Sequence, residues 1–208
     1  QKAAKEAIKA LPATSKITVA DKDAVQNAFD LDKAYTDMNG SATYAEQSTL
    51  NADIDALYAA MLKDFVIRTA QVDKTDKAAL KALQKEIKDA NEALFGADKL
   101  FASKAAFPTT DVDDALDTIK NKEAAAVKAA IDAIPVNVTE ADKATVEAAR
   151  KLYDAYVAEY TTYDAPEHNA AADINADSYA ALVAAETILG LNAEDPAMAV
   201  KAFKIKAS

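Results

Sequence analysis

Acidic residues at short spacing are the first places in this chain to look for metal chemistry. Asp173, Asn175 and Asp177 reproduce the opening D-x-N-x-D of a calcium-binding loop. Such a loop needs a glycine where Ser178 stands and a bidentate glutamate where Ala184 stands. We therefore expect a loop acid followed by a helix cap at this place, and no calcium site.

A second group of aspartates comes at the expected start of a helix: Asp111, Asp113, Asp114 and Asp117. Asp113 and Asp117 would share one helix face, as paired metal ligands do, but no histidine is near them in the sequence. Carboxylates in a first helical turn also complement the helix dipole. We expect that capping role and predict no metal or other cofactor.

The single histidine, His168, lies in the polar, turn-like run Asp164–Asn169. A catalytic triad would place it beside an activated serine or threonine, and the chain has no G-x-S-x-G nucleophile elbow. The chain contains no cysteine, which removes thiolate catalysis, and its glycines stand singly, which removes a phosphate-binding loop. We expect His168 to be a surface-loop residue and the protein not to be an enzyme.

Tyrosines form the most distinctive pattern of side chains. They recur at spacings of three and four residues, which places them on one helix face, and a further tyrosine follows on the next helix: Tyr153, Tyr156, Tyr160, Tyr163 and Tyr179. The rings could pack in a core with their hydroxyls at its edge, or form an exposed patch for a protein or a glycan. Tyr163, nearest the loop, should be the most exposed. The candidate binding residues are Tyr156, Tyr160, Tyr163, His168 and Tyr179.

Composition sets the fold class and excludes several partners. Of 208 residues, 51% are hydrophobic, many of them alanine, and only 3 Gly and 5 Pro occur, which predicts an all-α protein. The net charge is −10, and the 24 basic residues are interleaved with 34 acidic ones, so we expect no nucleic-acid binding. No apolar run reaches the roughly 18 residues of a membrane span, so we expect no membrane insertion.

The helices that carry these residues follow a short sequence unit that occurs three times: Ile17–Lys22, Val72–Lys77 and Val138–Lys143. Each copy precedes an amphipathic helix pattern. Thr18 and Thr139 lie three residues before an aspartate, which is typical of a capping box, and Asp73 stands in the same place in the middle copy. Pro12 and Pro135 end the preceding helices.

The repeats predict an elongated tandem array of three-helix bundles at 1–62, 63–122 and 123–195. Residues 49–70 and 111–134 contain neither Gly nor Pro, so we expect continuous helices shared by neighbouring bundles, as in spectrin. In segment 196–208, Phe203 and Ile205 alternate with lysines in a strand period. We expect that segment to be a linker or the start of a β domain.

The repeat residues resemble helical modules of large Gram-positive cell-surface proteins, the S-layer-type proteins and multidomain adhesins. Residues 130–189 carry the resemblance best, and residues 7–62 carry it less well because Asp32 replaces a stripe residue. The middle copy departs from the pattern at Ala93–Gly96. The resemblance implies extracellular display at the bacterial cell surface or cell wall, attachment through other domains and no enzymatic activity. It carries no known ligand residues.

From these observations we expect a stiff spacer that also offers a protein-interaction surface, with a host protein or a protein of the same surface as partner. One alternative is a specific host-protein binder, for example of immunoglobulin, because three-helix bundles can present two helices as a flat face. Another is binding of a cell-wall polysaccharide through the tyrosines, which the negative charge disfavours for an anionic polymer. Because the sequence begins at Gln1 and not at Met, we expect a piece of a longer protein.

Overall fold

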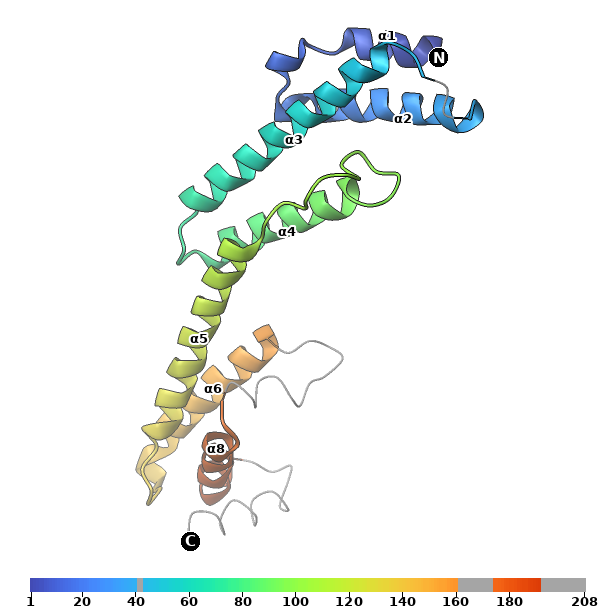
Figure 1. The fold of residues 1–208 in the computed structure, drawn as a ribbon. Helices are drawn as coiled ribbons and strands as arrows, with labels where there is room; N and C mark the ends of the chain where they lie inside the picture. Colours follow the sequence, from blue (N-terminus) through green and yellow to red (C-terminus); the bar gives the residue numbers. More distant parts are fainter. Residues whose placement is uncertain (41–42, 161–173, 192–208) are drawn as a thin grey trace. The chain divides into compact units, whose positions relative to one another are not determined.

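The computed structural model describes residues 1–40, 43–160 and 174–191, and the regular secondary structure in these ranges is helical throughout (Figure 1). The predicted all-α class is therefore confirmed. The chain divides into two compact units, Gln1–Leu116 and Asp117–Ser208. This division does not test the three repeat boundaries, which stay a prediction.

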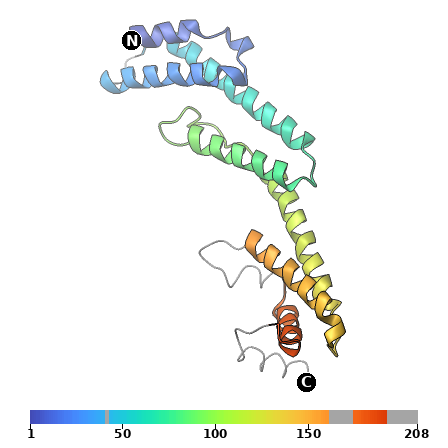
Figure 2. The same cartoon turned by 180° about the vertical axis from the view of Figure 1, so that it is seen from behind.

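Three helices of the first unit pack on one another: α1 (Lys2–Ala10), α2 (Lys22–Met38) and α3 (Glu46–Gln71) (Figure 1, Figure 2). Val25 and Ala28, which belong to the predicted apolar stripe of α2, are fully buried. Leu50 and Leu57 of α3 are buried as well. The apolar stripe predicted for α2 therefore faces the core of this unit at Val25 and Ala28.

The first unit continues with α4 (Lys77–Leu94) and the beginning of α5 (Thr110–Asp132). The buried side chains of α4 are those of its predicted stripe: Leu80, Leu83, Ile87 and Leu94. Residues 95–109 run between α4 and α5 without a helix, and Phe101 and Phe107 of this loop are buried. Their rings join those of Tyr58, Phe65 and Phe95, with centroids of neighbouring rings 5.0–6.3 Å apart.

An asparagine of α4 holds the same loop by its backbone. The Nδ2 of Asn91 donates to the carbonyl of Phe107 at 2.9 Å, and the N–H of Phe107 donates to Oδ1 of Asn91 at 2.8 Å. The hydroxyl of Tyr58 donates to the carbonyl of Ala105 at 3.0 Å. The long middle loop, which departs from the repeat pattern, is thus a packed part of the first unit.

The second unit contains the remainder of α5, α6 (Lys143–Tyr160) and α8 (Ala176–Ile188). Its core gathers residues from all three helices: Val127 and Ile131 of α5, Val146, Ala149 and Tyr156 of α6, and Leu182 and Ala185 of α8. Ile174, just before α8, is buried with them. The predicted stripe of α6 therefore packs inward over most of its length.

The capped turns fold in the same way in the first and third copies. Short 3-10 turns, η2 (Val19–Asp21) and η3 (Glu140–Asp142), precede α2 and α6. In both, the threonine N–H and hydroxyl donate to the aspartate Oδ2 at 2.8 and 2.9 Å. Both predicted capping boxes are confirmed.

The middle copy is capped differently. Asp73 has no hydroxyl to donate to Asp76, and it instead accepts from the N–H and the hydroxyl of Thr75, both at 2.8 Å. The side chain of Asp76 accepts from the N–H of Ala79 at 3.0 Å and caps α4 by itself. Asp73 therefore does not take the place that Thr18 and Thr139 have in their turns.

Helix ends differ slightly from the sequence-based ranges. The helix expected from Thr49 begins at Glu46, where the amide of Gln47 accepts from the N–H of Tyr44 at 3.1 Å. The helix expected over 111–134 spans Thr110–Asp132. The predicted strand near Phe203 lies outside the described residues. Each helix in the described part of the chain is too short or too polar to span a membrane.

Candidate functional site

The tyrosine stripe of α6 is divided between the core and its edge. Tyr156 is only 3% exposed, and its ring centroid lies 4.8 Å from that of Tyr160. Tyr160 is half-buried, and its hydroxyl donates to Oε2 of Glu123 at 2.5 Å. The ammonium of Lys120 lies 5.8 Å from the centroid of the Tyr160 ring. Tyr156 thus packs as a core residue, whereas Tyr160 reaches polar partners on α5.

Tyr179 of α8 belongs to a second aromatic group, which centres on Arg150. Its ring stacks on that of Tyr153, with centroids 4.9 Å apart and planes inclined by 27°. The guanidinium of Arg150 lies 5.4 Å from the ring centroid of Tyr153 and 5.7 Å from that of Tyr179. It also donates twice to the carboxylate of Glu186, from Nε and from one terminal nitrogen, both at 2.5 Å.

The electrostatics of this Arg150 group favour a fixed ion pair. Glu186 is 4% exposed, so its charge is stabilised by the bidentate contact instead of by water. The hydrogen bonds to Glu186 raise the pKa of Arg150 against the effect of burial, and burial raises the pKa of Tyr153. At neutral pH the arginine is charged and the tyrosine neutral.

The sequence-based candidates are therefore only partly brought together. Tyr156 and Tyr160 contact each other, and Tyr179 packs against Tyr153. Tyr163 and His168 lie outside the described residues. Arg150 and Glu186 were not predicted as site residues from the sequence. The rarity of arginine was a signal for Arg150, because the chain has only two arginines.

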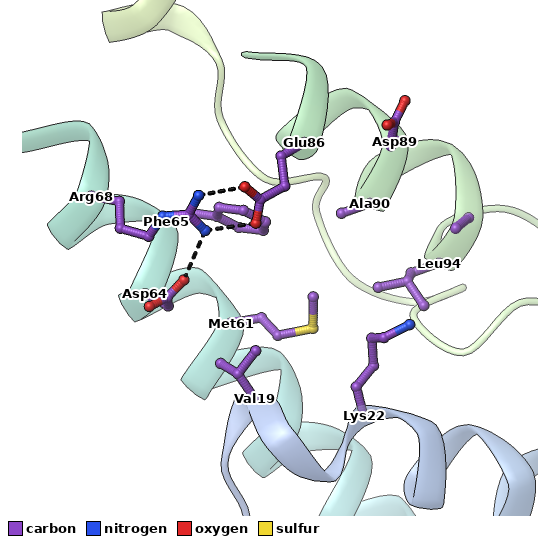
Figure 3. A pocket seen from close by; sticks show the side chains of 11 residues that line it. Val19, Lys22, Met61, Asp64, Phe65, Arg68, Glu86, Asp89, Ala90 and Leu94 are labelled. Carbon is purple, nitrogen blue, oxygen red and sulfur yellow. Dashed lines mark hydrogen bonds and ion pairs between the residues drawn. The ribbon is translucent and has the colours of Figure 1, made fainter. Parts of the chain in front are cut away.

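The other arginine, Arg68, borders a pocket of about 370 Å³ in the first unit (Figure 3). The pocket is formed by α3, α4 and the turn that starts α2. Its lining is mainly apolar: Val19, Met61, Phe65, Ala90, Ala93 and Leu94. Charged residues complete it: Lys22, Asp64, Arg68, Glu86 and Asp89.

Arg68 makes the same kind of ion pair as Arg150, in a more exposed place. Two of its terminal nitrogens donate to the carboxylate of Glu86, one of them at 2.6 Å, and it also contacts Asp64 one turn earlier at 3.3 Å. Its guanidinium lies 5.7 Å from the ring centroid of Phe65. The hydrogen bonds to Arg68 lower the pKa of Glu86 against the effect of burial. Both arginines thus join two helices by a bidentate ion pair beside an aromatic ring.

A polar cleft in the same unit contains four aspartates that lysines partly neutralise: Asp32, Asp37, Asp55 and Asp98. Lys33 pairs with Asp37 at 2.8 Å and with Asp98 at 3.4 Å, and Lys104 pairs with Asp55 at 2.6 Å. Asp32, which interrupts the apolar stripe, accepts from the hydroxyl of Tyr44 at 2.7 Å. These contacts explain the acid at that stripe position.

Asp113, one of the aspartates considered as metal ligands, has other partners. Burial tends to raise the pKa of Asp113, but hydrogen bonds from Thr109 at 2.6 Å and Gln84 at 2.5 Å outweigh it and lower the pKa. The side chain of Asn175 accepts from the N–H of Ser178 at 2.8 Å and caps α8. Within 1–40, 43–160 and 174–191, no group of His, Cys, Asp or Glu side chains is arranged to hold a metal ion.

Comparison with known proteins adds no relative: no protein-family model matches the chain, and no curated protein or solved structure does.

Proposed function

We propose that this chain is a non-catalytic helical segment of a bacterial cell-surface protein, displayed outside the cell. It serves as a stiff spacer and as a surface for protein contacts. The single observation that carries the proposal is the recurrence of one capped turn, with the same hydrogen-bond lengths, at Thr18 and Thr139. A structural unit that is repeated along a chain extends it and multiplies its surface without creating a single active site.

The arrangement of the ionisable residues supports the non-catalytic part of the proposal. Arg68 and Arg150 are each occupied by a glutamate, and the hydrogen bonds that they make raise their pKa values further. Catalytic acids and bases instead have pKa values that are moved towards the working pH. The long helices α3 and α5, of 26 and 23 residues, support the spacer part because a continuous helix resists bending.

Small-angle X-ray scattering on the full chain tests the spacer. A compact domain of 208 residues would have a radius of gyration of about 17 Å. We expect a value clearly above this and a distance distribution with a long tail. A radius close to that of the compact domain would contradict a spacer role.

A second candidate is specific binding of a host protein such as immunoglobulin. It is favoured by the differences among copies, because a pure spacer has no need for the pocket beside Ala90 or for the packed loop 95–109. Immobilised full-length chain should then retain a defined serum protein at micromolar concentration. If it retains none, while partners from the bacterial surface are retained, the host-binding candidate is wrong and the interaction role stands.

A further inference from the structure

The pocket beside Arg68 contains an alanine at a position where the other two copies carry tyrosine. Alignment of the copies on Asp21, Asp76 and Asp142 places Tyr35, Ala90 and Tyr156 at the same position. Tyr156 is 3% exposed in the core of its own unit. Tyr35 is half-buried and packs edge-on against another ring at 5.6 Å. The repeat pattern therefore provides for a ring at this place, and the middle copy lacks it.

The missing ring contributes to the cavity. Ala90 lines it together with Met61, Phe65 and Leu94, whose side chains surround the open space in Figure 3. A methyl group in place of a ring leaves apolar atoms without contact partners, unless the neighbouring side chains collapse into the space. Here they do not, and a volume of about 370 Å³ stays open, within the size range of small-ligand sites.

The charged residues at the rim of the pocket favour a ligand with a positive charge. The rim carries three carboxylates, Asp64, Glu86 and Asp89, against two cations, Lys22 and Arg68. Arg68 is shared between Glu86 and Asp64, so this triad has one net negative charge. The neighbours outside the rim do not change the balance, because Lys85 pairs with Asp89 at 2.5 Å and Asp23 pairs with Lys22 at 3.2 Å. A basic group beside the ligand would complement this rim.

A residue at the mouth of the pocket also differs in type from its counterparts in the other copies of the repeat. Val19, in the turn before α2, lines the pocket and is 40% exposed. The corresponding residues of the other copies are Lys74 and Glu140, both charged. Val19 thus extends the apolar lining to the surface of the molecule, where an incoming side chain would meet it.

We propose that this pocket receives an aromatic side chain of a protein partner, phenylalanine or tyrosine, with a lysine or arginine next to it in the partner's sequence. The inference rests on the proposed protein-interaction role and defines its partner. The aromatic ring takes the space that tyrosine fills in the other copies. The adjacent cation lies against the carboxylates of Asp64 and Glu86, which share the single charge of Arg68.

Amide chemical-shift mapping of the full chain by NMR tests the inference with three capped dipeptides, each acetylated and amidated. Phe-Arg is the probe. Ala-Arg lacks the aromatic ring, and Phe-Glu carries a negative charge in place of the positive charge of Phe-Arg. We expect Phe-Arg to bind with a dissociation constant of about 1 mM, with shifts concentrated at the pocket-lining residues. Ala-Arg should give no saturable shifts, and Phe-Glu should bind about two- to tenfold more weakly.

Two variants assign the binding to this pocket. Ala90→Tyr supplies the ring that the other copies have and should abolish Phe-Arg binding, whereas Ala82→Tyr, on the exposed side of the same helix, should leave it unchanged. Asp89→Lys reverses one rim charge at an exposed position and should reverse the preference between Phe-Arg and Phe-Glu. It also keeps the test valid if Ala90→Tyr does not fold.

Several results would overturn the inference: no Phe-Arg binding at concentrations up to about 10 mM, equal binding of Ala-Arg, or unchanged binding by Ala90→Tyr. Retention of natural partners distinguishes this failure from a failure of the proposed function. If wild type and Ala90→Tyr retain the same surface or serum proteins, the interaction role stands and the pocket is not its site. If neither variant retains any protein, the interaction role itself is wrong.

Discussion

At the scale of single residues, the carboxylate of Asp53 is a buried polar group with an incomplete set of hydrogen bonds. It is 1% exposed, Oδ1 accepts from the hydroxyl of Thr14 at 2.5 Å, and Oδ2 has no hydrogen-bond partner among the described residues. Thr14 therefore provides the one contact that compensates the removal of this group from water. The sequence pattern does not reveal this pairing, because the two residues are 39 positions apart.

We expect Thr14→Val to lower the free energy of unfolding by about 1–3 kcal/mol, because a buried polar group then loses its partner. Thr14→Ser keeps the hydroxyl and serves as the matched control, with a smaller loss. Urea unfolding followed by circular dichroism measures both. Equal stability of wild type and Thr14→Val would mean that Asp53 has another partner.

A second residue-scale prediction concerns the ion pair of Arg68 and Glu86 and its pH dependence. Because Arg68 lowers the pKa of Glu86 in the folded state, the pair stabilises the fold above the unfolded pKa of about 4.3. This stabilisation is lost as the pH falls through the lower, folded pKa. The Glu86 side chain is 51% exposed, so we expect a contribution of at most about 1 kcal/mol.

Glu86→Gln should therefore be less stable than wild type at pH 7, and the difference should shrink towards acidic pH, below about pH 4. Glu92→Gln, at an exposed position of the same helix, is the control. Unfolding free energies measured between pH 3 and 7 give the comparison. A difference that does not vary with pH would show that the charge of Glu86 contributes nothing.

At the scale of elements, the two capped turns allow a paired test. Thr18 and Thr139 make the same two hydrogen bonds to an aspartate three residues later, so their loss should cost the same. We expect Thr18→Ala and Thr139→Ala each to destabilise its own unit by about 0.5–2 kcal/mol. Hydrogen exchange at α2 and α6 measures the two effects separately. A cost in only one of the copies would mean that the turns are not equivalent.

The loop 95–109 is the element whose role the repeat pattern least predicts. The Phe107 side chain is buried among aromatic rings, so Phe107→Ala should cost about 3–5 kcal/mol. Ser103→Ala, at an exposed position of the same loop, should change stability by less than about 0.5 kcal/mol. Thermal unfolding of both variants checks this. A small loss from Phe107→Ala would show that the loop is not part of the core.

At the scale of the whole molecule, the two compact units predict two groups of amides that respond separately to mutation. Phe107→Ala should lower hydrogen-exchange protection in α3 and α4 and leave α8 unchanged, and Tyr156→Ala should do the reverse. α5 contributes residues to both units, so its protection should respond to both variants. Uniform loss of protection in all helices after either substitution would show that the chain unfolds as a single unit.

The features that can be predicted from the sequence are those that depend on near neighbours along the chain. Low Gly and Pro content predicts helices, a period of three and four residues identifies the buried face of α4 and α6, and Thr18 and Thr139 predict their own capping boxes. These signals are local because helix hydrogen bonds and capping boxes join residues only three or four positions apart. The tyrosines of the candidate site were found in the same way, by their spacing.

Which distant residues pack against those faces depends on how the helices are arranged in space. Arg150 pairs with Glu186, which is 36 residues away in the sequence, and Tyr160 donates a hydrogen bond to Glu123, which is 37 residues away. Phe107 packs on Tyr58 from a loop that has no helical period. The alanine at position 90 fits the apolar stripe as well as a tyrosine does, and the pocket exists because three separate elements leave the missing volume unfilled. Periodicity specifies that a side chain faces inward, but the partner and the remaining space depend on how the helices pack.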